Sequence, residues 1–78
     1  MIRQIIFDIE RGSGGGWVVT RRGASQPLGR VNRKADAIAR ARELAGRFDL
    51  AKVVIHGQDG EVQVEHTYGK LAHPSQGQ

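Results

Sequence analysis

Apolar and polar residues alternate in the first third of the chain, and this period of two is typical of strands with one buried face. Ile5, Phe7 and Ile9 follow this spacing within residues 2–10. The same alternation returns in residues 17–22, which begin with the only tryptophan of the chain. We therefore predict a strand in each range, with one face of each strand turned toward a core.

Glycine and proline separate these two strands from each other and from a third. Residues 11–16 read Arg-Gly-Ser-Gly-Gly-Gly, a composition that holds no regular structure. A phosphate-cradling loop would need a following Lys-Ser/Thr and a helix, and neither comes next, so we interpret the run as a hairpin loop. A turn at residues 22–24 leads to a short strand at residues 27–31, where Pro27 donates no backbone hydrogen bond and favours a sheet edge.

The hydrophobic period changes to that of a helix at residues 33–48. Asn32 can cap the first turn by accepting a backbone N–H bond, and Asp36 carries the negative charge that a helix start favours. Apolar side chains fall on one stripe and charged ones on the opposite side, which predicts an amphipathic helix of about four turns. The small alanines of the stripe allow the helix to approach a sheet closely. The stripe consists of Ala37, Ile38, Ala41, Leu44, Ala45 and Phe48.

Two runs rich in β-branched residues flank the Asp-Gly dipeptide at residues 59–60 and predict a β-hairpin. A two-residue type I′ turn at this dipeptide places His56 opposite Gln63 and Ile55 opposite Val64. Because side chains alternate between faces, one face of the hairpin is predicted to lie in the core and the other to remain polar.

The succession of three strands, a helix and two strands is typical of an α+β fold with a single antiparallel sheet and one amphipathic helix packed on one face. We assign residues 1–69 to this domain and residues 70–78, which show no periodicity, to a disordered C-terminal tail. The predicted core comprises Ile5, Phe7, Ile9, Val19, Ile38, Ala41, Leu44, Phe48, Val53, Ile55, Val62 and Val64. The face without a helix is predicted to carry Ile6, Asp8, Val18, Thr20, Arg22, Val54, His56, Gln63 and Glu65.

Net charge and cysteine content limit the binding partners and the cellular location that we expect for this protein. The chain has 78 residues, no cysteine and a net charge of +4, and nine of its twelve basic residues are arginine. A basic balance permits binding to nucleic acid or to an acidic protein, while arginine richness is also typical of proteins from GC-rich genomes. Charged residues interrupt every apolar run near the start, which argues against a secretion signal or a membrane partner. We expect a cytoplasmic protein.

Three segments in this order resemble a known family. They are Gly-Gly-Trp-Val-Val-x-Arg-x-Gly at residues 15–23, Lys-Ala-Asp-Ala-Ile-Ala-x-Ala-x-Glu-Leu-Ala at residues 34–45, and Val-Ile-His-Gly-Gln-Asp-Gly at residues 54–60 with a later Tyr-Gly. The set resembles the bacterial domain of unknown function 2188 family, in which a Thr tends to stand where this chain has Arg33. The resemblance implies a small bacterial domain and carries over no activity, cofactor or catalytic residue.

The histidines are the first candidates for chemistry. His56 and His66 are predicted on opposite sheet faces and His73 lies in the tail, so no three-histidine metal site and no cofactor are expected. His56 could form an acid/base pair with its neighbours Gln63 and Glu65, or it could simply belong to a polar ladder. No nucleophile or oxyanion loop accompanies it, so we name no catalytic residue and no small-molecule substrate.

Binding is the function that the pattern favours. Basic residues follow the second and third strands and the helix start, where a sheet could set cations against phosphates. We therefore predict a non-catalytic binding module that contacts nucleic acid, with a protein-interaction or homodimerisation module as the alternative, using the uncovered sheet face or the edge strand near Leu28. The candidate binding residues are Arg21, Arg22, Arg30, Arg33, Lys34 and His56.

Overall fold

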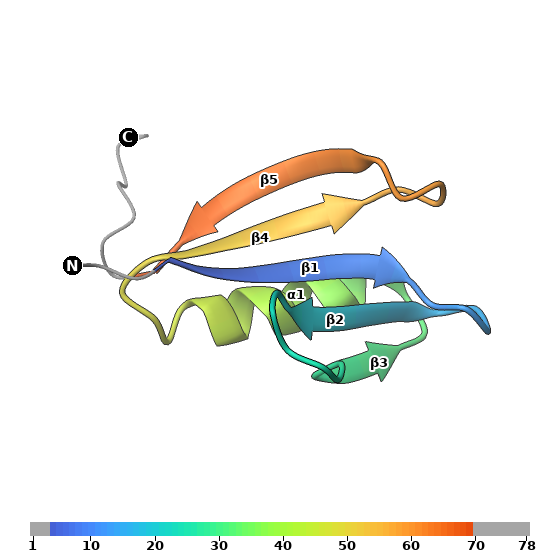
Figure 1. The fold of residues 1–78 in the computed structure, drawn as a ribbon, viewed down its shortest axis with the longest axis horizontal. Coiled ribbons are helices and arrows are strands. Elements are labelled where there is room, and N and C mark those ends of the chain that lie inside the picture. The colour runs from blue at the N-terminus through green and yellow to red at the C-terminus, as the bar shows by residue number, and fades with distance from the viewer. Residues whose placement is uncertain (1–3, 70–78) are drawn as a thin grey trace.

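A computed structural model of the protein describes residues 4–69, and the tail predicted for residues 70–78 lies outside the described residues. Figure 1 shows one sheet with a single helix on one side, an α+β arrangement. The sheet order is β3-β2-β1-β4-β5, which differs from the order along the chain. The elements are β1 (Ile5–Arg11), β2 (Trp17–Arg21), β3 (Gly29–Val31), α1 (Lys34–Ala45), β4 (Ala51–His56) and β5 (Val62–Tyr68).

The sheet is mixed, and the prediction of a purely antiparallel sheet is wrong. β1 and β4 run parallel, with Asp8 paired to Val54, while the other neighbouring strands are antiparallel. The physical reason is the helix: α1 carries the chain back along the sheet after β3, so β4 begins at the same end as β1 and pairs beside it in the same direction. β1 and β4, which are far apart in the sequence, thus pair with each other at the middle of the sheet.

The core lies between α1 and the sheet. Ala37, Ala41 and Ala45 are fully buried, which confirms that alanines form the contact stripe of the helix. Because methyl groups are short, the helix backbone can lie close to the strands, and Phe7 and Val53 fill the space beneath it. Ile38, Leu44 and Phe48 pack against the edge of this core and are partly buried.

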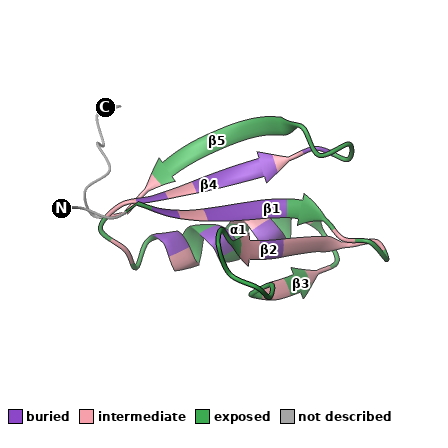
Figure 2. Ribbon diagram, viewed as in Figure 1, coloured by how far each residue is buried: buried purple, intermediate pink, exposed green. Residues whose placement is uncertain are grey.

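Two residues of the predicted core are exposed. Val62 keeps 51 % of its surface accessible and Val64 keeps 40 %. α1 packs on β1, β2, β3 and β4, so the strand at the far edge of the sheet has no helix above it. Figure 2 shows β5 exposed along most of its length. The alternation of apolar and polar residues therefore identified the strand correctly. The prediction that Val62 and Val64 belong to the core is wrong, because the core beneath α1 does not extend to β5.

The β4–β5 hairpin closes with a three-residue loop rather than the predicted two-residue type I′ turn. The Gly60 N–H donates to the Gly57 carbonyl at 3.0 Å, and the Gly57 N–H donates to the Glu61 carbonyl at 2.8 Å. Gly60 has φ +90°, whereas Asp59 does not have a positive φ, and type I′ requires two such residues. The loop is a type I turn followed by a glycine bulge.

This loop changes the register next to it. His56 pairs with Val62 instead of Gln63, and an irregularity between Ile55 and His56 restores the predicted pairing of Ile55 with Val64. Gln63 is also displaced from the uncovered face to which it was assigned, because its side-chain oxygen accepts a hydrogen bond from Lys34 Nζ on the helix side at 2.7 Å.

The helix begins one residue later than predicted. Arg33 rather than Asn32 occupies the cap position, with extended φ and ψ of −120° and 146° and no side-chain capping bond. The helix ends at Ala45, so Phe48 contacts the core from the turn that follows.

Candidate functional site

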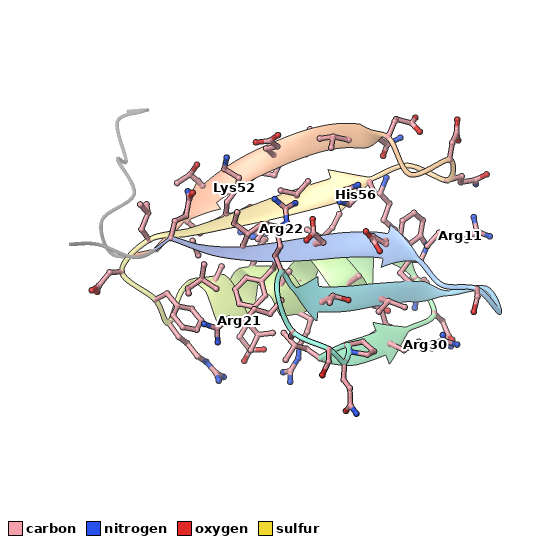
Figure 3. The ribbon with its side chains drawn as sticks, viewed as in Figure 1. Arg11, Arg21, Arg22, Arg30, Lys52 and His56 are labelled. Atoms are coloured by element: carbon pink, nitrogen blue, oxygen red, sulfur yellow. The ribbon has the colours of Figure 1, made fainter. Side chains whose placement is uncertain are left out.

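The sheet divides the six predicted binding residues between its two faces. Arg21 pairs with Phe7 and its guanidinium lies 5.6 Å from the centre of the Phe48 ring, on the helix side. Arg22 follows directly and turns to the face without a helix, here called the open face (Figure 3). The two neighbouring arginines therefore lie on different surfaces. This agrees with the alternation of side chains along β2.

Arg22 is held by a buried carboxylate. Its Nε donates to Asp8 Oδ2 at 3.1 Å and its Nη2 donates to Asp8 Oδ1 at 2.7 Å, a two-pronged contact. His56 Nε2 lies 2.9 Å from the same Oδ1. We call Asp8, Arg22 and His56 the open-face cluster. The cluster exists because β1 and β4 pair in parallel, with Asp8 opposite Val54. His56 is two residues beyond Val54 on the same face of β4, so its ring can reach Asp8.

The hydrogen bonds of His56 indicate its protonation state. Its Nδ1 faces the Gly60 carbonyl at 3.1 Å and its Nε2 faces a carboxylate, so both ring nitrogens meet acceptors. Only the doubly protonated ring donates to both. The hydrogen bond with Asp8 raises the pKa of His56, burial opposes this, and the Gly60 carbonyl and the charges of Asp8 and Glu10 add to the rise.

Asp8 remains ionised although it is only 8 % exposed. Burial by itself acts to raise the pKa of this carboxyl, but the hydrogen bonds from Arg22 and His56 together with their charges hold it below its ordinary value. The contact with Asp8 raises the pKa of Arg22 in turn. The cluster is thus a charged network whose members each stabilise the ionised form of the others.

The cluster replaces the acid/base pair considered from the sequence. Glu65 points its Oε1 at Lys52 Nζ, 3.2 Å away, and Gln63 lies on the helix side. Since both nitrogens of His56 are engaged, the ring has no free lone pair to accept a proton from a substrate in this geometry. The arrangement fits a structural role for His56.

The middle of the open face, at Val54, is covered by its own side chains. Val54 turns away from the helix, yet it is only 3 % exposed. Its strand partners are Asp8 and Glu65, which bind Arg22 and Lys52 on the same face. Figure 3 shows Arg22, Lys52 and His56 over this part of the sheet. The face therefore presents paired charges rather than an apolar patch.

A second group of cations gathers where β1 and β3 end and α1 begins. The Arg11 guanidinium lies 5.7 Å and the Lys34 amine 5.3 Å from the Trp17 ring centre. Trp17 is itself paired with Arg11 on one side and Val31 on the other. Gly16, with φ +73°, lets the chain pass this point: a Cβ there would lie 2.8 Å from the Val31 carbonyl oxygen.

Arg30 and Arg33 complete this group, and we call Arg11, Arg30, Arg33 and Lys34 the basic end. The Arg30 guanidinium reaches back to the glycine loop, where a Cβ on Gly12 would lie 3.5 Å from its Nη2. Arg33 caps the helix and its Nε lies 3.8 Å from an Asp36 carboxylate oxygen. Figure 3 shows Arg11 and Arg30 at the same end of the sheet.

At this end of the sheet the structure holds three of the predicted residues, Arg30, Arg33 and Lys34, and adds Arg11. Arg11 and Lys34 meet at Trp17 on the helix side. Arg30 pairs with Val18 and therefore lies on the open face. The sequence contained the signal for Arg11: the glycine run is a hairpin loop, as predicted, and a hairpin closed by residues 12–16 sets Arg11 opposite Trp17. The loop bonds within itself, with the Gly12 N–H donating to the Gly16 carbonyl at 3.0 Å.

Among residues 4–69, no group of three or more His, Cys, Asp or Glu side chains is placed to hold a metal ion. The helix found within the same residues is too short and too polar to cross a membrane.

The mixed sheet, its single helix and the basic end define a small α+β protein with a charged open face and a cationic end. The chain belongs to the domain of unknown function 2188 (DUF2188) family, described as an uncharacterized protein conserved in bacteria, whose family model matches residues 9–68. This confirms the resemblance found in the sequence. No curated protein and no solved structure matches the chain.

Proposed function

We propose that the protein is a non-catalytic module that binds nucleic acid through phosphate contacts from the basic end. The observation that carries this proposal is the convergence of Arg11 from β1 and Lys34 from the start of α1 on the Trp17 ring, at the end of the sheet that also holds Arg30 of β3. Among residues 4–69, Arg33 is the only member of the basic end with a carboxylate oxygen within 4.0 Å. Its partner, Asp36, is exposed, so the contact is weak.

The charges elsewhere support the basic end over the other predicted cations. Arg22 and Lys52 on the open face are paired with Asp8 and Glu65. On the outer side of α1, Arg40 and Arg47 both lie within 4.0 Å of Glu43. Paired cations attract a polyanion less because a neighbouring negative charge offsets each of them. Arg21 and Arg42 also have no carboxylate oxygen within 4.0 Å among residues 4–69, but each lies over an aromatic ring, Phe48 and Tyr68 respectively. The basic end differs from them because it gathers four cations at one end of the sheet, of which only Arg33 has a carboxylate partner in the described part of the chain.

The chemistry favours phosphate as the recognised group. Arginine presents a planar fork of donors that matches phosphate oxygens, and three of the four cations are arginines. The amino end of α1 points to the same place, and its dipole adds positive potential there. Contacts of this kind position a nucleic acid without reading its bases, so we expect binding with little sequence preference.

Docking of a protein on the open face has less support. Val54, the residue that an apolar partner would need to reach, is buried under its own neighbours. A partner would also have to displace or match the charges of the open-face cluster. Replacing Val54 by a charged residue would thus disturb the fold before it disturbed a docking surface.

Fluorescence anisotropy of labelled duplex and single-stranded oligonucleotides tests the proposal. The wild-type protein is expected to bind both, with affinity falling as salt rises. The triple variant Arg11→Gln, Arg30→Gln, Arg33→Gln should lose about three units of the slope of log affinity against log salt on duplex DNA, since each lost phosphate contact removes about one. Lys34 is retained because its amine contacts Trp17 and Gln63.

A matched control separates this site from net charge alone. Arg40→Gln, Arg42→Gln, Arg47→Gln removes the same charge from exposed positions on and just after α1, away from its amino end. It should retain the wild-type salt slope. Equal losses in both triple variants, or an affinity that salt does not change, would overturn the proposal.

A further inference from the structure

β5 is an unprotected sheet edge. It spans seven residues, pairs with β4 on one side, and has no strand partner on its other side among residues 4–69. Every residue of β5 except Tyr68 is exposed. The backbone N–H and C=O groups along such an edge form a template for another strand. At the opposite edge, β3 has only three residues and follows Pro27 closely, so the edge predicted near Leu28 is the shorter and better guarded one.

Features that usually block edge pairing are missing from residues 64–68 of β5. Residues 64–68 contain no proline and no lysine, and their one carboxylate, on Glu65, is turned toward Lys52 of its own chain at 3.2 Å. The irregularity between Ile55 and His56 interrupts the start of the strand. Regular pairing can therefore extend over residues 64–68.

The sequence of β5 is self-complementary in one register. Two copies of β5 related by a two-fold axis would pair antiparallel, and paired residues must have their side chains on the same side of the sheet. One residue therefore faces its own copy, and the axis lies between the two. An axis at Glu65 sets two like charges opposite each other, and an axis at Val64 runs the pair into the irregular stretch. An axis at Thr67 pairs only residues 66–68 before β5 ends. An axis at His66 places Val64 opposite Tyr68 and Glu65 opposite Thr67, so apolar groups meet and no carboxylates face each other.

We infer that β5 pairs with β5 of a second copy of this chain, antiparallel and centred on His66, to form one continuous sheet. The contact involves five residues from each chain, so the interface is smaller than a stable dimer needs and association should be weak. β5 contributes no residue to the basic end. Self-association and nucleic-acid binding consequently use separate surfaces, and either can fail without the other.

Single-cysteine crosslinking tests the register, because the chain has no cysteine of its own. His66→Cys sets two thiols opposite each other across the axis, within disulfide reach. Under mild oxidation it should form a disulfide dimer about tenfold or more faster than Arg40→Cys, an exposed position on α1 far from the edge. Equal rates for these two variants would overturn the inference.

A mixed experiment makes the test specific. Glu65→Cys and Thr67→Cys should each crosslink slowly alone, because neither faces its own copy, and rapidly when mixed, because position 65 of one copy faces position 67 of the other. A mixture no faster than its components would contradict the register.

Sedimentation velocity measures the association itself. The wild-type protein should shift from monomer toward dimer as its concentration rises to about the millimolar range, the range typical of small interfaces. Val64→Lys should remain monomeric with an unchanged circular dichroism spectrum, because Val64 is already 40 % exposed and the new charge blocks the edge. A wild-type protein that stays monomeric throughout would overturn the inference.

Discussion

At the scale of single residues, the buried carboxylate of Asp8 determines the character of the open face. A carboxylate that loses most of its water is unstable unless hydrogen bonds replace that water. Arg22 supplies two and His56 a third. Asp8 is thus tolerated in a strand whose other buried residues are apolar, and it explains why a histidine and an arginine far apart in the sequence lie together.

The raised pKa of His56 predicts how stability depends on pH. Its pKa is higher in the folded than in the unfolded chain, where it is near 6.5, so the stabilisation is complete below that value. As pH rises through the folded pKa, the ring loses a proton and one of its two hydrogen bonds, and the stabilisation is lost. Urea unfolding at stepped pH should show the free energy of unfolding decreasing above pH 6.5.

The control for this prediction is His56→Gln, which has no titrating group at the position. Its free energy of unfolding should change less than that of the wild type across the same pH window. An NMR titration should also give a pKa of His56 above 6.5. Identical pH profiles for the two proteins would contradict the prediction.

At the scale of elements, the close approach of α1 depends on its alanines. Ala41 is fully buried beneath the middle of the helix, and a larger side chain would push the helix away from the sheet. We expect Ala41→Leu to lower the free energy of unfolding by about 1–3 kcal/mol through overpacking.

Ala39 provides a matched control on the same helix. It is exposed, so Ala39→Leu adds the same volume in solvent and should change stability by less than about 0.5 kcal/mol. Denaturant unfolding of both variants measures the difference. Equal effects at the two positions would show that the packing of α1 on the sheet differs from that described here.

The hairpin shows which features of an element its sequence carries. Two β-branched runs around Asp-Gly identified both strands, and the pairing of Ile55 with Val64 was predicted correctly. The turn was not, because Asp-Gly also fits a type I turn with a glycine bulge, in which only glycine takes a positive φ. A local sequence compatible with two turn types does not select between them.

At the scale of the whole molecule, the open-face cluster and the basic end lie on different parts of the sheet and share no residue. Groups without common partners contribute independently. Asp8→Asn should lower the free energy of unfolding by about 1–3 kcal/mol, because it removes the charge that Arg22 and His56 share, while leaving nucleic-acid affinity unchanged.

The basic-end triple variant should behave in the opposite way, losing affinity while its unfolding midpoint stays close to that of the wild type. Urea unfolding and anisotropy on the same preparations measure both quantities. A loss of affinity in folded Asp8→Asn would place the open-face cluster within the binding surface and contradict this separation.

The candidate site was only partly readable from the sequence. Arg30, Arg33 and Lys34 are close along the chain, so the local density of positive charge was enough to predict them as binding residues. Arg11 required the register of the first hairpin, a step that the sequence permits. The pairing of Asp8 with His56 joins residues 48 positions apart, and no local pattern indicates it.

The sequence by itself determined the strands, the helix and the faces along which most side chains alternate, because these depend on backbone periods of two and 3.6 residues that a short segment already contains. Tertiary structure decided that β4 lies parallel to β1, that Asp8 meets His56, and that Val62 and Val64 remain in solvent. These outcomes depend on where a single helix packs and how far it reaches across the sheet. That is a property of the assembled layers, and no segment carries it alone.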